Sequence, residues 1–365
     1  MRNFVGIVAQ QDNLAVDPVQ PSMAEEMLGD AGVADSRPYV LLDSPFFPEF
    51  QELFDKHVRC IFVSELVRKG VDEAISNDVA AVISGACEGC PVVADNIVAV
   101  VSHLHLPFKA AELAQLRNLR VVSNHGVGYG HIDAAYLCER GVPLGFTPGA
   151  ASAPTAELGA ALILASARNL VPSVRHAGAP TTTSFNPYWY GTRVTGATLG
   201  LVGFGAMAQE LVVYMRGFNM EVLYWNRTRR EALETELGVT WCAGGLSELL
   251  NRSDFVVLCV ASSPETRNMM GADQFRMMKS SATLVNIARG DIVVQQDLVE
   301  ALKSGSIAAA ALDVTIPEPL PRDHPLLSME NVIVTSHIGS QTKADRRRMA
   351  EMCLENLLAG LQNRA

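Results

Sequence analysis

The segment ATLGLVGFGAMA, residues 197–208, indicates the fold of this chain most directly. Its apolar first half is typical of a buried strand, and the G-x-G-x-x-A pattern after it is typical of the turn that leads into a helix and binds a dinucleotide. Gly203 permits the tight turn, Gly205 lets a pyrophosphate approach the backbone, and Ala208 lets the helix pack closely on the strand. A tight turn without a ligand is the alternative. The cofactor contacts that this pattern predicts are Gly203, Gly205, Ala206 and Met207.

The next strand-like run, EVLYW (221–225), ends in Asn226-Arg227-Thr228-Arg229-Arg230. In such units an acidic residue at this place usually binds the ribose 2′-hydroxyl of NAD. Here no acid stands there, and the guanidinium groups of the three arginines match a 2′-phosphate in charge and geometry. We therefore expect NADP(H) to be preferred, with NAD(H) possible, and expect contacts from Asn226, Arg227 and Thr228. The alternative is an exposed helix start whose arginines meet only solvent.

Strand-like and helix-like segments alternate on both sides of this unit. The later strand-like runs are DFVVLCV (254–260), ATLVNIA (282–288) and AAAALDV (308–314). The earlier ones are YVLL (39–42), CIFV (60–63), AAVI (80–83), IVAVV (97–101) and RVVS (120–123). Residues 153–170 predict a buried helix, and 343–361 predict an amphipathic helix that docks on another element. The pattern predicts an α/β fold with two doubly wound, parallel-sheet, Rossmann-like units, preceded by an extension at 1–37.

Composition narrows the classes of function. The chain has 365 residues and a net charge of -10, which argues against nucleic acid or a membrane surface as a partner. No apolar stretch approaches the roughly 20 residues that span a bilayer. The cysteines are odd in number and scattered, which is typical of reduced thiols, so we expect a cytoplasmic protein. Cys87 and Cys90 form a lone C-x-x-C without a second ligand pair, so no metal site is expected.

Three polar residues of the C-terminal third are candidates for chemistry on a 2-oxo acid. Its reduction needs a cation for the carboxylate, a proton donor for the carbonyl oxygen, and a group that keeps the donor charged and oriented. Arg289 follows LVNIA, Glu318 lies shortly after Asp313 at the end of AAAAL, and His337 follows NVIVTS. Because ligands bind beyond the carboxyl ends of parallel strands, these groups can converge. Taken singly, each has an ordinary structural explanation: a surface arginine, a turn and a helix cap.

These residues lie in segments that resemble the signatures of D-2-hydroxyacid dehydrogenases. The segments are NHGVGYGHID (124–133), TPGAASAPTAEL (147–158), LVNIARGDIV (284–293), AALDVTIPEPLPRDHPLL (310–327) and NVIVTSHIGSQT (331–342). The similarity extends from about 98 to 362, and the segment around Glu318 especially resembles glyoxylate/hydroxypyruvate reductases.

The resemblance implies a role for each candidate. Arg289 would bind the substrate carboxylate, and His337 would be the acid/base paired with Glu318, whose charge favours the imidazolium. Asp313 would face the nicotinamide carboxamide. The remaining implied contacts are Ala288 and Gly339 for the cofactor, and Val127, Gly128, Ser102, His103 and Leu104 for the substrate, with Ser84-Gly85-Ala86 as a second choice for the substrate loop.

The resemblance also implies a domain organisation. A substrate-binding domain would comprise 38–149 and 338–365, a dinucleotide-binding domain would comprise 150–337, and a cleft would separate them. Family members are commonly homodimers. Two alternatives stay open: a dehydrogenase of another 2-hydroxy acid, such as 3-phosphoglycerate or D-lactate, and a cofactor-sensing protein similar to the corepressors that share this fold. Turnover with a panel of 2-oxo acids separates them.

Overall fold

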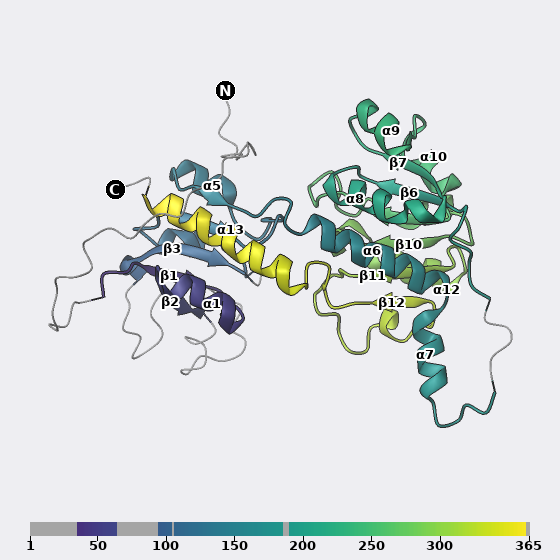
Figure 1. The fold of residues 1–365 in the computed structure, drawn as a ribbon, viewed down its shortest axis with the longest axis horizontal. Helices are drawn as coiled ribbons and strands as arrows, with labels where there is room; N and C mark the ends of the chain where they lie inside the picture. The colour runs from purple at the N-terminus through teal and green to yellow at the C-terminus, as the bar shows by residue number, and fades with distance from the viewer. Residues whose placement is uncertain (1–34, 64–93, 104–105, 185–189, 363–365) are drawn as a thin grey trace. The chain divides into compact units, whose positions relative to one another are not determined.

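The computed structural model describes residues 35–63, 94–103, 106–184 and 190–362, which form two compact units (Figure 1). Unit 1 comprises the described residues up to His125, His131–Phe146 and those from Cys353 onwards, and unit 2 comprises Gly126–Gly130 and Thr147–Met352. Residues 126–130, 147–149 and 338–352 thus belong to unit 2, whereas the sequence led us to expect them in the other domain. The expected extension up to 34, the strand at 80–83, the C-x-x-C and Leu104 lie outside the described residues.

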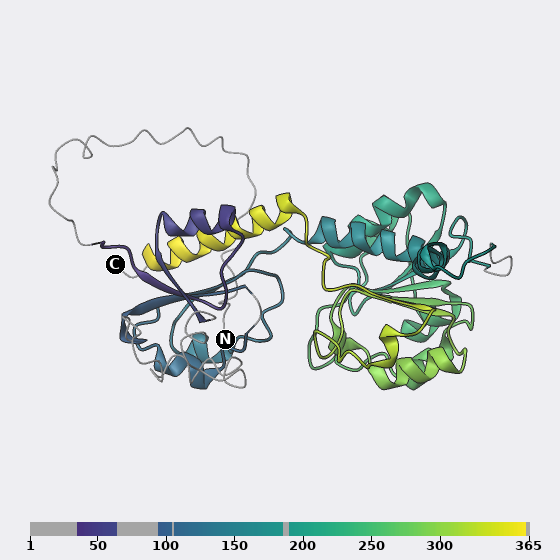
Figure 2. The same ribbon diagram turned by 90° about the horizontal axis from the view of Figure 1, so that it is seen from below.

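Unit 1 is built on a five-stranded parallel sheet of order β2-β1-β3-β4-β5. Its elements are β1 Tyr39–Leu42, α1 Pro48–Asp55, β2 Arg59–Phe62, η2 Ala94–Asn96, β3 Ile97–Ser102, α4 Ala110–Gln115, β4 Val121–Asn124, α5 Ala134–Glu139 and β5 Leu144–Gly145. Figure 2 shows α1 and the end of α13 on one face of this sheet and α5 on the other. Helices on both faces make the unit doubly wound.

Helix α13, Lys343–Gln362, confirms the helix predicted for 343–361 and docks on unit 1 through its last turns. Cys353 and Leu357 are fully buried. Ser123 Oγ donates to the carbonyl oxygen of Cys353 over 2.8 Å, and Asn356 Nδ2 donates to that of Phe146 over 2.9 Å. Buried apolar side chains and paired polar groups together fix this end of the chain.

Unit 2 is built on a seven-stranded parallel sheet of order β12-β11-β10-β9-β6-β7-β8. Its helices and 3-10 turns are α6 Ser152–Ala167, α7 Leu170–Gly178, α8 Ala206–Met215, η3 Arg216–Phe218, α9 Glu231–Leu237, α10 Gly245–Arg252, α11 Ala272–Met277, η4 Gly290–Ile292, α12 Gln295–Lys303 and η5 Pro325–Leu327. Its strands are β6 Thr198–Val202, β7 Glu221–Trp225, β8 Thr240–Trp241, β9 Phe255–Leu258, β10 Thr283–Asn286, β11 Ala309–Leu312 and β12 Val332–Val334. The strand order reverses between β6 and β9, which is where doubly wound sheets bind ligands.

Both faces of this sheet are covered, which explains why its strands are apolar throughout. On one face α6 and α8 pack on strand residues such as Leu199 and Val257. On the other, α10, α11 and α12 pack on residues such as Val256 and Leu284. Figure 2 shows the sheet between these two layers. The predicted helix at 153–170 is confirmed as α6, which ends at Ala167 before Asn169 takes a left-handed conformation with φ 50°.

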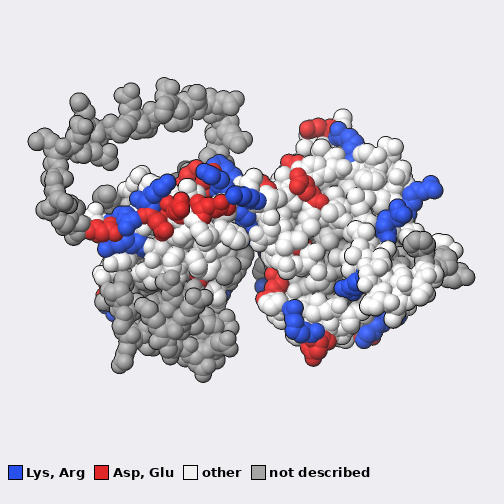
Figure 3. Space-filling view, turned by 60° about the horizontal axis from the view of Figure 1, so that its bottom comes forward, with Lys and Arg blue, Asp and Glu red and all other residues white. Residues whose placement is uncertain are grey.

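Charged side chains of both signs are interspersed on the face of unit 1 seen in Figure 3. Within unit 1, for example, Arg37 Nη2 lies 2.7 Å from Asp35 Oδ2, and in the part of α13 that belongs to unit 2, Arg347 Nε lies 2.9 Å from Glu351 Oε1. Within the described ranges, no helix is both long and apolar enough to cross a membrane.

Candidate active site

The turn after β6 has the geometry that a dinucleotide pyrophosphate needs. Gly203 has φ +93°, and a Cβ there would come within 2.9 Å of the backbone nitrogen of Val260. Both the backbone conformation and the lack of space therefore exclude a side chain. Gly205 and Ala206 are exposed at the start of α8, and a Cβ on Gly205 would meet no atom within 4 Å. Exposed backbone at a helix N-terminus, with open space before it, fits a phosphate group.

The arginines in the loop after β7 differ in whether they form ion pairs. Arg229 is paired with Glu234 through two bonds, Nε to Oε1 at 2.9 Å and Nη2 to Oε2 at 2.8 Å, and also lies 3.2 Å from Glu231. These bonds from Arg229 are the main reason that the pKa of Glu234 falls to about 2. Arg227 is exposed and has no ion-pair partner among the residues that the structure describes. Unlike that of Arg229, the guanidinium of Arg227 is therefore available to an anion.

Arg289 is held by the turn that follows β10. Asn286 accepts from the backbone N–H of Ala288 over 3.0 Å and donates to the carbonyl oxygen of Arg289 over 2.9 Å. The Arg289 Nη1 group donates to the Ala288 carbonyl over 2.7 Å. Burial lowers the pKa of Arg289, against the opposing effect of the charges on Glu318 and Asp291. The result is a half-buried, oriented guanidinium, which stays charged because arginine does not deprotonate in proteins.

Gly128 lies against this guanidinium within unit 2. A Cβ on Gly128 would overlap Arg289 Nη2 and would lie 3.2 Å from its Cζ. The backbone of residues 126–130 therefore borders the charged end of Arg289, with Val127 46% exposed beside it. The structure thus brings together Val127, Gly128 and Arg289, three of the residues expected to bind the substrate.

Glu318 and His337 form an ion pair at the ends of β11 and β12. His337 Nδ1 lies 2.8 Å from Glu318 Oε2, while Glu318 Oε1 accepts from the backbone N–H of Thr315 over 2.8 Å. Burial raises the pKa of Glu318, but the bond from His337, the charges of His337 and Arg289, and the Thr315 bond outweigh it, so the net shift is downward. The carboxylate is thus kept ionised beside the imidazole.

Asp313 anchors the loop that carries His337. Its side chain is 2% exposed and accepts from Thr335 Oγ1 over 2.6 Å and from the N–H groups of Ile338 and Gly339, each over 2.9 Å. Its carbonyl oxygen accepts from His337 N over 3.0 Å. His337 itself has φ 54°, a conformation that costs about 1–3 kcal/mol outside glycine and so needs such support.

Ser102 and His103 lie in unit 1, in a polar group at the end of β3. Ser102 Oγ lies 2.9 Å from His131 Nε2 and donates to Asp43 Oδ2 over 3.3 Å, and the backbone N–H of His103 donates to Asp43 Oδ1 over 2.8 Å. Asp43, which the sequence did not single out, is 2% exposed and orders this segment.

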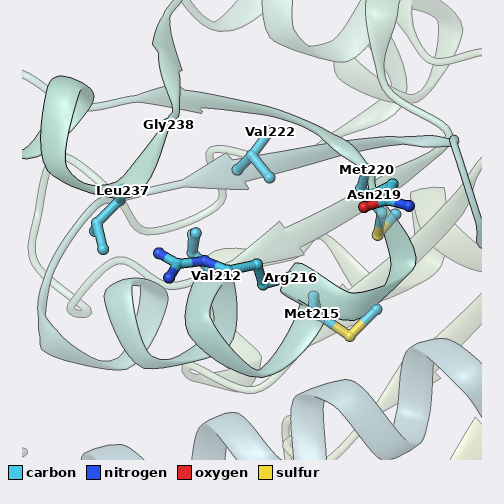
Figure 4. A pocket seen from close by; sticks show the side chains of 8 residues that line it. All are labelled: Val212, Met215, Arg216, Asn219, Met220, Val222, Leu237 and Gly238. Carbon is cyan, nitrogen blue, oxygen red and sulfur yellow. The ribbon is translucent and has the colours of Figure 1, made fainter.

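A pocket of about 220 Å³ lies elsewhere in unit 2, between the end of α8, η3, β7 and α9 (Figure 4). Its lining consists of Val212, Met215, Arg216, Asn219, Met220, Val222, Leu237 and Gly238. The phosphate turn begins α8 and the pocket lies towards its other end, so at 1.5 Å per residue about 9 Å of helix separates Ala206 from Val212, the first lining residue. This pocket is not the candidate cofactor site.

Asn286, which orders the turn that holds Arg289, is a further residue of the candidate site that the sequence did not single out. It lies inside the predicted strand at 282–288, and the observed strand β10 ends at it.

Comparison with known proteins gives consistent results. The model of the D-isomer specific 2-hydroxyacid dehydrogenase NAD-binding domain matches residues 160–339. The glyoxylate reductase of Korarchaeum cryptofilum is 41% identical over 72% of this chain and 79% of its own length. The glyoxylate reductase/hydroxypyruvate reductase of Mus musculus is 38% identical over 68% of this chain and 76% of its own. A solved structure of a Thermus thermophilus protein superposes with a TM-score of 0.75 and 32% identity, covering 89% of this chain and 97% of that one.

Proposed function

The chain belongs to the D-isomer specific 2-hydroxyacid dehydrogenase family, and we propose that it reduces glyoxylate or hydroxypyruvate to the 2-hydroxy acid with NADPH. It is an oxidoreductase with a nicotinamide-dinucleotide domain of Rossmann-like topology. The names of its relatives from Korarchaeum cryptofilum and Mus musculus support a small 2-oxo acid as substrate.

One observation carries the proposal: a cation and an acid/base pair follow the ends of neighbouring strands. Arg289 follows β10, Glu318 follows β11 and His337 follows β12, and these strands are adjacent in the sheet. Because carboxyl ends of parallel strands meet at one edge, the three side chains serve one site. Arginine suits a carboxylate because its planar guanidinium offers two parallel N–H bonds.

The pairing with Glu318 assigns the two nitrogens of His337. An ionised carboxylate only accepts hydrogen bonds, so Nδ1 carries a proton and donates to Glu318 Oε2. Nε2 is then the atom at which the imidazolium gives up its proton to the carbonyl oxygen of the substrate. Arg289 orients the carboxylate of the substrate, and Glu318 keeps the imidazole oriented.

The cofactor, when bound, supplies the hydride. The residues that would hold it are Gly203, Gly205, Ala206 and Met207 at the phosphate turn, Asn226, Arg227 and Thr228 at the ribose, and the backbone near Ala288, Asp313 and Gly339. Open space before Gly205 supports this assignment. Arg227 is exposed and forms no salt bridge with a described residue, which supports the preference for NADP(H) over NAD(H).

We further propose a cytoplasmic homodimer. Its five described cysteines are free thiols, consistent with a reducing compartment. Leu170 and Val174 on α7 are 51% and 64% exposed, which supports contact with a second copy through unit 2.

Steady-state assays of the purified protein test the proposal. The panel contains glyoxylate, hydroxypyruvate, pyruvate and 3-phosphohydroxypyruvate, each with NADPH and with NADH. Highest kcat/KM for glyoxylate or hydroxypyruvate with NADPH is expected. Preference for pyruvate or the phosphorylated acid would assign another dehydrogenase activity. Tight cofactor binding without turnover of any acid would contradict an enzyme and favour a sensing role.

A further inference from the structure

The hydroxyl of Tyr224 lies inside the protein and is bonded twice. Tyr224 is fully buried, donates to Glu234 Oε1 over 2.7 Å and accepts from the backbone N–H of Arg230 over 2.8 Å. Burial and the bond to Glu234 raise the pKa of this phenol, so it stays a donor at neutral pH. Two partners on the following segment are thereby fixed by one side chain of β7.

Through these two partners, Glu234 and Arg230, Tyr224 stabilises the 226–230 loop. Glu234, on α9, also holds Arg229 through the two bonds described above. Arg229 in turn lies 5.4 Å from the ring centroid of Trp241, within reach of a cation–π interaction. The positive charge of Arg229 is therefore already balanced by these contacts within the protein. At the front of the loop, Asn226 Nδ2 donates to the carbonyl oxygen of Thr228 over 3.0 Å and closes the turn.

The ring of Tyr224 makes a second connection. It stacks on Phe204 with centroids 4.3 Å apart and planes inclined by 26°. Phe204 is the residue between the two glycines of the phosphate turn and is 2% exposed. Tyr224 thus packs on the segment that would bind the pyrophosphate and forms hydrogen bonds to the segment that would bind the ribose.

We propose that Tyr224 is the positioning residue for cofactor selection, acting with Glu234 to hold the 226–230 loop so that Arg227 and Thr228 meet a ribose 2′-phosphate. The inference rests on the proposed NADP(H) preference and adds the device that maintains it. Arg229 belongs to this device and not to the ligand contacts. The hydroxyl acts by positioning the backbone of the loop. Its loss therefore weakens the binding of ligands that carry a 2′-phosphate and leaves the binding of ligands without one unchanged.

Two substitutions that leave the charge unchanged separate positioning from electrostatics. Tyr224→Phe removes both hydrogen bonds and keeps the stack on Phe204. Glu234→Asp keeps the carboxylate but shortens it, so that it cannot reach Tyr224 and Arg229 together. Tyr214→Phe, on α8 of the same unit, is the control. Binding is measured by titration with NADPH, NADH, adenosine 2′,5′-bisphosphate and 5′-AMP, so turnover is not needed.

Both variants should bind NADPH and adenosine 2′,5′-bisphosphate about three- to tenfold more weakly, the range that one or two hydrogen bonds support. Binding of NADH and 5′-AMP should change less than about twofold, as should all binding by the control. An unchanged NADPH preference in both variants, or equal losses for all four ligands, would overturn the inference alone. Equal affinity of the unmodified protein for NADPH and NADH would instead overturn the cofactor proposal, and this inference with it.

Discussion

His337 donates through Nδ1 to Glu318 over 2.8 Å, and the same carboxylate accepts from the backbone of Thr315 through its other oxygen. The carboxylate is therefore fixed before it orients the imidazole. The bond and the charge of His337 lower the pKa of Glu318 against the effect of burial, so the carboxylate stays ionised beside the imidazole.

Glu318→Gln should move the basic limb of the kcat/KM profile to lower pH. The variant removes the negative charge that favours the imidazolium, so His337 loses its proton at lower pH and the protonated, proton-donating form disappears earlier. The profile with glyoxylate and NADPH between pH 5 and about 9 measures this shift. Glu300→Gln, on the surface of α12, is the matched control and should leave the limb in place. A limb that stays fixed in Glu318→Gln would mean that Glu318 does not tune His337.

Gly128→Ala should impair substrate use without affecting the cofactor. Its Cβ would overlap the Arg289 guanidinium, which must then move from its position. We expect a higher KM for glyoxylate and a lower kcat, because the carboxylate loses its aligned partner. Gly130→Ala is the matched control in the same segment, since a Cβ there meets nothing within 4 Å. Normal kinetics in Gly128→Ala would show that Arg289 need not occupy this position.

Asp313→Asn should lower both stability and turnover. One carboxylate oxygen becomes an NH₂ group that faces N–H or O–H donors, which costs about 1–3 kcal/mol of the free energy of unfolding at a buried site. The loop then holds His337 less firmly, so kcat falls. Thr335→Val removes only one of the hydrogen bonds to the Asp313 carboxylate and should lower the free energy of unfolding by about 1 kcal/mol. Denaturant unfolding and steady-state kinetics measure the two effects. Equal losses in both variants would contradict an anchoring role for Asp313.

Arg227→Ala should raise the KM for NADPH much more than that for NADH, because only NADPH carries the 2′-phosphate. Arg276→Ala, an exposed arginine on α11, provides the control for a general change of surface charge. Parallel increases for both cofactors would remove Arg227 from the 2′-phosphate site.

The sequence predicts much of this fold because hydrophobic periodicity reports burial directly. Two short strands cannot be predicted from periodicity, because β5 and β8 have only two residues each, too few to show a pattern. The apolar run 254–260 also outlasts β9, which ends at Leu258. Val260 beyond it packs where a Cβ on Gly203 would stand. Burial continues there although the ladder of strand hydrogen bonds has ended.

The candidate site is predictable to the level of which residues stand at strand ends. Glu318 and His337 follow adjacent strands, so their meeting could be anticipated. The partners of Asp313 and Arg229 could not. A polar residue beyond a strand looks the same in sequence whether it faces a ligand, as we expected for Asp313, or the N–H groups of the next loop, as the structure shows.

We propose that Arg289 holds the carboxylate of a 2-oxo acid while His337 protonates its carbonyl oxygen. Arg289→Lys keeps the charge but loses the planar two-point contact, so the carbonyl can rotate away from the hydride. The decisive measurement pairs steady-state kinetics on glyoxylate with a fluorescence titration of NADPH, for the unmodified protein and for Arg289→Lys. We expect a raised KM and a lowered kcat with nearly unchanged NADPH affinity. Intact glyoxylate kinetics, or a loss confined to NADPH binding, would exclude this role of Arg289.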